Sequence, residues 1–242
     1  MRPLTLLRPK PLCPVGGVSL LELAVARCAA LVDDVAVNAR YGVDAITGAV
    51  GGRVHVSDER GYPEELGTGG AVAALAPWLA GRAVLVVNGD TWTTVDLAPL
   101  LSGWDGERVR VLLHATATLD DGAGVVGSLV PAADVPRLPL APIGLSNGLW
   151  ARARREGRLE VLAGDGDFVA CDTPADYLRA NLTASGGASV IGHGAAVEGE
   201  VCRCVVWPGA RVARGERLVD AIRCTDRMTV LVRQPASSFS PQ

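Results

Sequence analysis

Two residues in this chain have side chains suited to phosphate chemistry at positions that would hold them still. Lys10 stands between Pro9 and Pro11, which fix φ on both sides and favour a stiff, extended loop. Such a loop can aim an ammonium group at a ligand with little further loss of conformational freedom. Asp90 follows the apolar run 83–87, and a carboxylate there can hold Mg²⁺ against phosphate oxygens. Taken singly, each also fits a plainer interpretation, a solvated lysine and a turn-capping aspartate.

A glycine-rich stretch, Gly67-Thr-Gly-Gly70, precedes a segment with a helical pattern. Glycine lets a backbone come close to a flat ligand, and the N-terminus of a helix offers free N–H groups. Because glycines are common at helix starts, the stretch becomes informative only together with Lys10 and Asp90.

The elements that must position these loops follow an alternating pattern. Residues 19–31 predict a helix, because apolar residues recur at helical spacing after a Ser19 cap with Glu22 three positions on. Further helices are predicted at 42–49 and 174–182, a loop leading into a helix at 67–79, and strands at 35–38, 54–56, 83–87 and 109–115. This alternation predicts a parallel sheet covered on both faces, with ligands beyond the carboxyl ends of its strands. Between 122 and 159 four prolines favour strands and loops over helix.

Composition narrows the classes of function. The 242 residues are 49% hydrophobic and 20% charged, with a formal net charge of −3, so there is no basic footprint for nucleic acid. No apolar run approaches a membrane span and no signal-peptide core follows Met1, so a cytoplasmic location without a membrane partner is expected. Six scattered cysteines without a C-x-x-C pair argue against zinc or a disulfide framework.

The spacing of apolar residues changes after the linker at 185–187. Apolar residues then recur every six positions, at Val206, Val212, Leu218, Cys224 and Val230. A second set with the same step, offset by three positions, consists of Ile191 and Val197. This period predicts a short left-handed parallel β-helix at 188–232, with a β-hairpin tail as the alternative. The expected domains are therefore 1–184, 188–232 and a flexible tail at 233–242.

The order and spacing of these motifs resemble the sugar-1-phosphate nucleotidylyltransferase family. The matching segments are Arg8-Pro-Lys-Pro-Leu12 with Pro14-Val-Gly-Gly17, Leu66-Gly-Thr-Gly-Gly-Ala71, Val87-Asn-Gly-Asp90, and 168–181, which is similar to that family's Trp-x-Asp-x-Gly-Thr-Pro-x-Asp-Tyr segment. The likeness covers nearly the whole chain and is weakest at 92–165. It implies a Rossmann-like nucleotidyltransferase domain with a parallel-rich sheet, plus a short C-terminal left-handed β-helix.

The resemblance also implies a reaction and its participants. A sugar 1-phosphate oxygen attacks the α-phosphate of a nucleoside triphosphate in line, and pyrophosphate leaves, so that catalysis is positioning plus charge neutralisation. The implied roles are phosphate contact by Lys10 and Arg8, a base pocket lined by Gly67, Thr68 and Gly69, and Mg²⁺ coordination by Asp90. Self-association through the β-helix is a further expectation.

One departure from the family lies at the N-terminus. The family's Gly-Gly-x-Gly-Thr-Arg loop and the strand before it are absent, and that strand belongs between those predicted at 35–38 and 83–87. Three buried aliphatic side chains contribute roughly 5 to 9 kcal/mol, against a total stability of about 5 to 15 kcal/mol. We therefore expect Met1 to be an internal methionine, with the native start about 15 to 25 residues upstream, judged by the length of a strand and a loop.

The other departure is chemical. Ala170 matches the position of the family's second Mg²⁺ aspartate, and Asp172 stands where the family has glycine. Alanine cannot ligate a cation. Asp172 would face the same side of a strand, but displaced by about 7 Å. The sequence predicts weak or altered dependence on Mg²⁺, with Asp172 as the candidate second ligand.

Two functional classes remain open. The first is a nucleotidyltransferase that resembles mannose-1-phosphate guanylyltransferase, with a uridylyltransferase as the second choice. Whether such an enzyme is active depends on where translation starts. The alternative is a non-catalytic or regulatory relative that binds nucleotide sugar, which the absent loop and Ala170 favour. A hexapeptide-type acyltransferase is discounted, because two or three coils are too few for the usual site between subunits.

Overall fold

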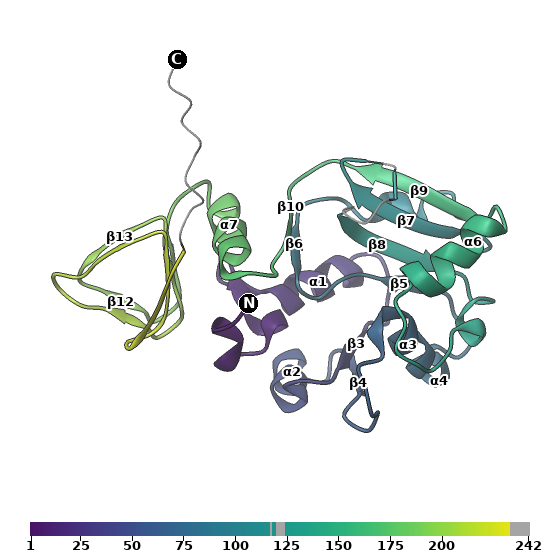
Figure 1. Cartoon of the computed structure of the whole chain (residues 1–242), viewed down its shortest axis with the longest axis horizontal. Helices are drawn as coiled ribbons and strands as arrows, with labels where there is room; N and C mark the ends of the chain where they lie inside the picture. Colours follow the sequence, from purple (N-terminus) through teal and green to yellow (C-terminus); the bar gives the residue numbers. More distant parts are fainter. Residues whose placement is uncertain (117, 120–123, 233–242) are drawn as a thin grey trace, which may run out of the picture. The chain divides into compact units, whose positions relative to one another are not determined.

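The computed structural model describes residues 1–116, 118–119 and 124–232 (Figure 1). They form two compact units that alternate along the chain. The first unit comprises residues 1–23, 90–92 and the chain from 169 onwards, and the second comprises 24–89 and 93–168. The chain passes between the units at four places, which are 23/24, 89/90, 92/93 within β6 (Thr91–Thr93) and 168/169 within β10 (Phe168–Ala170). The domain boundary expected at 184–188 falls inside the first unit.

The second unit contains two sheets among its described residues. In one, β3 (Ala36–Ala39) pairs in parallel with β4 (His55–Asp58). The other has the order β5 (Val84–Val86), β8 (Val125–Val130), β7 (Val109–His114) and β9 (Leu159–Gly164). The pair β7 and β9 is parallel, whereas β8 is antiparallel to both of its neighbours. The prediction of a parallel sheet was therefore wrong at β8, because the connection from β7 to β8 is too short for the crossover that parallel strands need.

Helices flank these strands. They are α1 (Leu20–Ala29, which begins in the first unit), α2 (Val43–Val50), α3 (Gly67–Ala74), α4 (Ala76–Leu79), α5 (Ala98–Leu101), a 3₁₀ turn at Val135–Arg137, a π-helical segment at Ser146–Trp150 and α6 (Ala151–Arg155). The helices predicted at 19–31, 42–49 and 67–79 are confirmed. The expectation of strands and loops at 122–159 was wrong for 146–155. Leu145, Leu149 and Ala153 repeat at helical spacing beyond the last proline, a signal that the prolines obscured.

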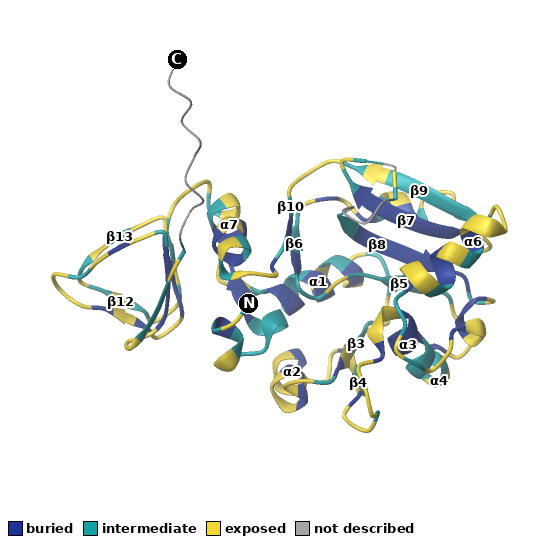
Figure 2. Cartoon of the chain, viewed as in Figure 1, coloured by how far each residue is buried: buried dark blue, intermediate teal, exposed yellow. Residues whose placement is uncertain are grey.

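The central strands of the larger sheet are buried on both faces. Figure 2 shows β7 and β8 largely in dark blue. Val111 and Leu113 pack with Leu149 on one face, and Leu112 packs with Leu129 on the other. Burial on both faces explains why these strands are mostly apolar rather than alternating, and the two buried polar residues, Arg110 and Ser128, are hydrogen-bonded.

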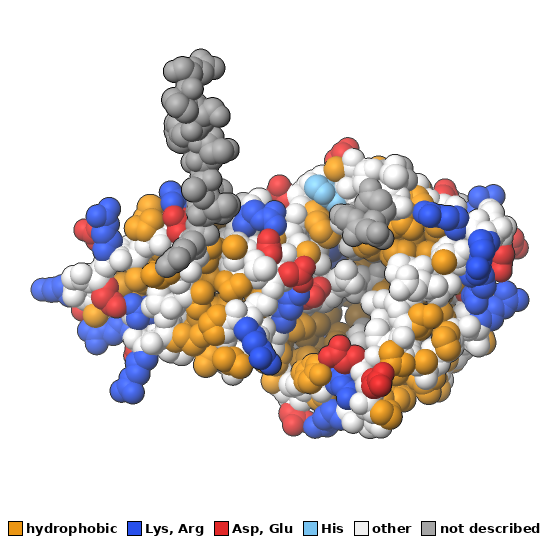
Figure 3. Space-filling view, viewed as in Figure 1, with side chains coloured by type: hydrophobic (Ala, Val, Ile, Leu, Met, Phe, Trp, Pro, Cys, Tyr) orange, Lys and Arg blue, Asp and Glu red, His pale blue; other side chains and the backbone are white. Residues whose placement is uncertain are grey.

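Charged side chains are distributed over the surface. On the face shown in Figure 3, acidic and basic groups are interspersed rather than gathered by sign, in keeping with the small net charge. None of the described helices is long and apolar enough to cross a membrane.

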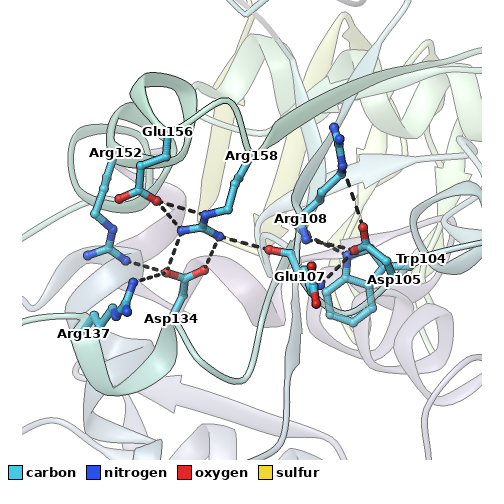
Figure 4. Close-up of polar contacts among 9 residues, drawn as sticks. All are labelled: Trp104, Asp105, Glu107, Arg108, Asp134, Arg137, Arg152, Glu156 and Arg158. Atoms are coloured by element: carbon cyan, nitrogen blue, oxygen red, sulfur yellow. Dashed lines mark hydrogen bonds and ion pairs between the residues drawn. The ribbon is translucent and has the colours of Figure 1, made fainter.

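One carboxylate of the second unit, Asp134, is buried within a group of arginines (Figure 4). Its side chain is 2% exposed, and it accepts hydrogen bonds from Arg152 at 2.8 Å and Arg158 at 3.0 Å, with Arg137 at 4.0 Å. Burial alone would raise the pKa of Asp134, but the hydrogen bonds and charges of Arg158 and Arg152 outweigh it and lower that pKa. The cluster joins the 135–137 turn, α6 and the start of β9.

The first unit begins with two 3₁₀ turns, Leu4–Leu6 and Lys10–Leu12, and a hairpin of β1 (Pro14–Val15) and β2 (Val18–Ser19). Lys10 thus starts a helical turn, closed by the Cys13 N–H on the Lys10 carbonyl oxygen at 3.1 Å, and the extended conformation expected for Lys10 was wrong. The first residues of a helical turn have no partner for their N–H groups, so Pro11 fits there without losing a hydrogen bond.

Helix α7 (Pro174–Ala184) packs beside this N-terminal segment and confirms the helix predicted at 174–182. Thr173 and Asp176 form a capping box at its start. Tyr177, fully buried, donates a hydrogen bond to the Pro14 carbonyl and accepts one from Trp207 Nε1 at 3.0 Å. One core therefore joins the N-terminal turns, α7 and the C-terminal coils.

The C-terminal coils consist of short strands in three parallel ladders, which give a triangular outline in Figure 1. The ladders are β11 (Val190–Ile191), β14 (Val205–Val206) and β17 (Ala221–Thr225); β12 (Ala196–Val197) and β15 (Arg211–Val212); and β13 (Glu200–Cys202) and β16 (Arg217–Val219), with β18 (Met228–Leu231) antiparallel to β17. Val206, Val212 and Leu218 share a buried core, as the step of six predicts. Ile191 is 44% exposed, so its expected inward position was wrong.

Candidate functional site

The first unit brings one ammonium and two carboxylates together. Lys10 Nζ lies 2.7 Å from Asp90 Oδ2 and 2.7 Å from Asp172 Oδ1. The Lys10 side chain is 23% exposed, whereas those of Asp90 and Asp172 are 41% and 69% exposed. The cluster is therefore partly shielded at the ammonium and open to solvent at the carboxylates.

Local structure explains why Asp172 reaches this cluster. The Cys171 N–H donates to the Asp90 carbonyl oxygen at 3.2 Å, and the Asp172 N–H donates back to the Ala170 carbonyl oxygen at 3.0 Å. A hydrogen bond across a single residue marks a tight reverse turn at the end of β10. The displacement of about 7 Å expected for Asp172 assumed a continuing strand, and that assumption was wrong because the chain turns after Ala170.

Lys10 is the single lysine of the chain. Burial lowers the pKa of Lys10, but hydrogen bonds and charge from Asp172 and Asp90 outweigh it, so that this pKa is raised above its ordinary value of 10.5. The group is an ammonium at neutral pH. The lysine ammonium is a compact charge with three donors on a flexible stem. It can therefore turn from carboxylate oxygens to phosphate oxygens more readily than the planar guanidinium of an arginine can.

Two thiols lie close to this cluster in sequence. Burial raises the pKa of Cys13 to about 11 and that of Cys171 to about 12. Both are protonated at neutral pH and inert as nucleophiles, because the thiolate is the reactive form. The chemistry of the cluster is therefore that of charge and hydrogen bonding.

Asp90 and Asp172 fit a magnesium ion by their donor chemistry. Mg²⁺ is commonly held by one or two carboxylates together with substrate phosphates and water. Two carboxylates that already share one cationic group present this donor set, whereas Ala170 adds no ligand. Among the described residues no group of three or more His, Cys, Asp or Glu side chains could hold a metal. Substrate oxygens would have to complete the coordination.

Arg8 lies over the ring of Trp207, with its guanidinium carbon 4.9 Å from the ring centroid. This is the geometry of a cation–π contact. The structure thus places Arg8 against the C-terminal coils, on an aromatic ring whose Nε1 donates to Tyr177.

The glycine-rich stretch belongs to the second unit and is occupied by another segment of the chain. The N–H groups of Gly69 and Gly70 both donate to the Ile143 carbonyl oxygen, at 2.8 and 3.3 Å. A Cβ on Gly70 would lie 2.3 Å from the Ala141 carbonyl oxygen, and one on Gly67, which has a φ of +64°, would lie 2.8 Å from that of Ile143. The expectation that this helix start offers free N–H groups was therefore wrong at Gly69 and Gly70.

Thr68, which is exposed, lines a cavity of about 450 Å³ in the second unit. Other polar residues of its lining, beside the ring of Trp150, are Asn88, Ser128, Ser146, Asn147 and Arg154. Side-chain amides and hydroxyls next to an aromatic ring suit a small polar ring-shaped ligand. Sequence reasoning missed Asn147 and Arg154, because 146–155 was not expected to be helical.

Arg40 fixes the loop that leads to Thr68. Its guanidinium donates to four carbonyl oxygens, those of Glu59, Tyr62, Pro63 and Glu64, at 2.8 to 3.1 Å. One planar cation thereby satisfies four acceptors of a turn that has little regular structure of its own. The entry to α3 is held in place from the end of β3.

No family model matches the sequence. Over 127 residues the chain is 32% identical to the mannose-1-phosphate guanylyltransferase of Mycobacterium tuberculosis (strain ATCC 25618 / H37Rv). That match covers 51% of this chain and 35% of the relative, so the chain matches about a third of that protein's length.

Two solved structures have a similar fold. One is described as mannose-1-phosphate geranyltransferase from Thermus thermophilus, with a TM-score of 0.68, 17% identity, and coverage of 93% of this chain and 88% of that one. The other is HddC from Yersinia pseudotuberculosis complexed with GMP-PN, with a TM-score of 0.57, 17% identity, and coverage of 72% and 89%. The chain thus resembles a mannose-1-phosphate guanylyltransferase in sequence over half of its length, and it resembles these two solved structures in fold over 93% and 72% of its length.

Proposed function

We propose that this protein transfers a nucleotidyl group from a nucleoside triphosphate to a sugar 1-phosphate, giving an NDP-sugar and pyrophosphate. The observation that carries the proposal is the Lys10–Asp90–Asp172 cluster, in which an ammonium and two carboxylates meet. In-line attack on an α-phosphate needs little from a protein beyond alignment and neutralisation of charge on phosphate oxygens. A charged lysine beside two potential cation ligands supplies both.

Each residue of the cluster has a role in this proposal. Lys10 exchanges its carboxylate partners for phosphate oxygens when a triphosphate binds, and so keeps its charge-assisted hydrogen bonds. Arg8 adds positive charge from its place on the Trp207 ring. Asp90 and Asp172 would hold Mg²⁺, which when bound neutralises phosphate charge. No thiol takes part, because Cys13 and Cys171 are protonated at neutral pH.

The cavity beside Thr68 is proposed to hold the base or the sugar. Hydroxyl and amide groups of Thr68, Asn88 and Asn147 can donate and accept hydrogen bonds, and Gly67 and Gly69 shape the backbone next to Thr68. The likeness to the Mycobacterium tuberculosis relative supports GTP and mannose 1-phosphate as the substrates, and UTP is the second choice of nucleotide. A triphosphate substrate suits a reaction in the cytoplasm.

The C-terminal coils are proposed to wind left-handed, as the period of six favours, and to mediate self-association. Ile191 and Val219 are 44% and 41% exposed, and Leu231 is 69% exposed, which supports a partner surface on the coils. Light scattering coupled to size-exclusion chromatography would compare the wild-type protein with an Ile191→Lys, Val219→Lys variant. A dimer that becomes a monomer is the expected result.

The proposed activity is tested by incubating the protein with each nucleoside triphosphate and several sugar 1-phosphates and measuring pyrophosphate release. We expect release with GTP and mannose 1-phosphate, and at least a hundredfold loss in Lys10→Met, in keeping with the loss of one positioned charged group. Arg214→Met, on the exposed surface of the coils, is the matched control. Binding of nucleotide sugar without any turnover would instead select the non-catalytic relative.

A further inference from the structure

Two contacts hold the segment that carries Lys10, one on each side of the lysine. Before the lysine, the Arg8 guanidinium carbon lies 4.9 Å from the centroid of the Trp207 ring. After it, the Pro14 carbonyl oxygen accepts a hydrogen bond from the Tyr177 hydroxyl, which itself accepts one from Trp207 Nε1 at 3.0 Å. Both contacts therefore lead to a single side chain of the C-terminal coils.

The two contacts use different parts of the Trp207 indole. The face of the ring carries the Arg8 guanidinium in a cation–π contact, and the N–H at the ring edge donates to Tyr177. A side chain that only filled the core would need neither contact. A buried indole N–H needs some acceptor, but its acceptor here is the hydroxyl that also bonds to Pro14. Both polar uses of the ring thus serve the same segment.

The two ends of the segment are not equally supported. The Pro14 carbonyl oxygen accepts a second hydrogen bond, of 3.3 Å, from Asn181 Nδ2, so this end keeps a partner if the bond from Tyr177 is lost. The Arg8 side chain has no hydrogen bond or ion pair with any residue that the structure describes, and the ring is its support. The face of Trp207 should therefore matter more to the position of Lys10 than its N–H does.

The 3₁₀ turn Lys10–Leu12 has little of its own that fixes it to the rest of the first unit. Its two backbone hydrogen bonds, of 2.9 and 3.1 Å, join Leu12 to Pro9 and Cys13 to Lys10, and both stay within the segment. None of residues 10–12 is buried. The carboxylate contacts of Lys10 Nζ are the ones that the proposed function gives up when a phosphate binds. The position of the ammonium then depends on the two ends of the segment.

Trp207 is itself held firmly by the coils. It is 3% exposed and follows directly after β14. Its N–H donates to the Arg223 carbonyl oxygen of the next coil at 2.8 Å, and its carbonyl oxygen accepts the Ala210 N–H at 3.1 Å. A buried ring with both backbone groups bonded has little freedom to move, because protein interiors are close-packed. The ladders of the coils therefore fix the ring, and the ring fixes the lysine segment.

We propose that Trp207 is a positioning residue for Lys10, which it holds through Arg8 and Pro14, so that the C-terminal coils take part in the reaction site. The effect of Trp207 on catalysis rests on the proposed function, in which Lys10 contacts phosphate. Its effect on the lysine itself can be observed without any turnover, so the two can be tested separately.

The first measurement follows the lysine directly. Because the chain has a single lysine, ¹⁵N labelling of lysine gives one side-chain signal, and ammonium protons held in hydrogen bonds exchange slowly with water. In Trp207→Leu, which removes the ring, we expect these protons to exchange about fivefold faster than in the wild type, in keeping with the loss of a cation–π contact. Trp207→Phe keeps a ring face for Arg8 and loses the N–H, so we expect an increase below about twofold.

Val212→Ala is the matched control. Val212 is fully buried in the coils, but in a cluster without residues of the N-terminal segment, so its lysine signal should match that of the wild type. Unchanged exchange in Trp207→Leu, or equal acceleration in Val212→Ala, would overturn the proposal.

If Trp207→Leu does not fold, Arg8→Met takes its place, because Arg8 is only half-buried. Losing a neighbouring positive charge would by itself slow the base-catalysed exchange of the ammonium protons. Faster exchange in Arg8→Met would therefore report the lost support, and unchanged or slower exchange would overturn the proposal.

Turnover gives the second measurement. Trp207→Leu should lower kcat for pyrophosphate release about tenfold or more and change the KM for the triphosphate less than about threefold, because a displaced ammonium no longer neutralises the charge that grows as pyrophosphate leaves. Val212→Ala should change either constant by less than about twofold. A lowered kcat with an unchanged lysine signal would contradict the positioning role. A changed lysine signal with an unchanged kcat would support that role and contradict the proposed contact of Lys10 with phosphate.

Discussion

Asp172 accepts a hydrogen bond from Lys10 although the two residues are 162 positions apart in the chain. The contact exists because the chain reverses after Ala170, where the Asp172 N–H closes a tight turn. Asp90 shares the same ammonium group. Lys10 therefore keeps two carboxylates together that would otherwise repel each other.

The ionisation of Lys10 can be followed directly, because selective ¹⁵N labelling of lysine places a single side-chain signal in the spectrum. We expect its pKa to lie above 10.5, since hydrogen bonds and charge from Asp172 and Asp90 outweigh burial. A raised folded-state pKa means that the stabilisation by Lys10 is fully present below the unfolded-state pKa and is lost as the pH rises through the folded-state value. The melting temperatures of wild type and Lys10→Met should therefore differ by a constant amount from pH 6 to pH 9 and converge at higher pH. A lysine signal that titrates below 10.5 would refute the paired arrangement.

Adding a carboxylate at position 170 should raise the apparent affinity of the protein for Mg²⁺. Ala170 immediately precedes the turn that carries Asp172, and it contributes no ligand of its own. For Ala170→Asp we expect the Mg²⁺ concentration at half-maximal pyrophosphate release to fall at least tenfold, because a further hard oxygen ligand joins the two present. The measurement is a Mg²⁺ titration of a form with measurable turnover, with Ala170→Asn as an uncharged control of similar size. An unchanged titration curve would show that position 170 does not face the ion.

Loss of the buried carboxylate at Asp134 should destabilise the second unit. Removing one partner of a buried ion pair destabilises by about 3 to 5 kcal/mol, and we expect about 2 to 3 kcal/mol for Asp134→Asn because Arg152 and Arg158 are partly exposed. The lowered pKa of Asp134 means that its stabilisation is present above the unfolded-state pKa and is lost as the pH falls through the folded-state value. Urea denaturation at pH 7 and pH 3 measures both effects.

The control for this measurement is Arg137→Ala. Arg137 lies 4.0 Å from the same carboxylate, but its side chain is 61% exposed, so we expect a change below about 0.5 kcal/mol. If both variants lose the same stability, burial of the carboxylate is not the source of the effect.

Tyr177→Phe should loosen the shared core of the first unit. The hydroxyl donates to the Pro14 carbonyl and accepts from Trp207, so its loss leaves a buried indole N–H without that acceptor. We expect a loss of about 1 to 3 kcal/mol, the range for an orphaned buried polar group, measured by thermal unfolding. Tyr41→Phe, at a side chain that is 69% exposed, should change stability by less than about 0.5 kcal/mol. Equal and small effects would mean that the hydroxyl does not tie Pro14 to Trp207.

Features that depend on local sequence were predictable. The Ser19 cap, which accepts the Glu22 N–H at 3.2 Å, and the Thr173 cap mark the starts of α1 and α7 as their residue types indicate. The run 83–87 contains β5 (Val84–Val86), and the step of six agrees with the shared buried core of Val206 and Val212. In each case the signal and its physical cause lie within a few residues of each other.

Features that depend on distant segments were not predictable. The amides of Gly69 and Gly70 donate to the carbonyl oxygen of Ile143, a residue far along the chain, whose own N–H donates to the Leu66 carbonyl oxygen. The direction of β8 depends on a short connection, and the approach of Asp172 to Lys10 depends on a reverse turn at the end of β10. The periodicity of apolar residues does not predict such contacts, because they form only when elements far apart in the sequence pack together.

The core around Tyr177 has a consequence for genetics. Ile222 and Cys224 of the C-terminal coils belong to the same buried cluster as Leu4 and Cys13, which flank Lys10 in sequence. A missense allele at Ile222 would therefore act on the lysine turn through packing alone. In a screen for lost activity, such an allele would be recovered together with alleles of Lys10 itself. A second substitution that restores the apolar volume at position 222 would rescue the first kind of allele but not an allele of Lys10.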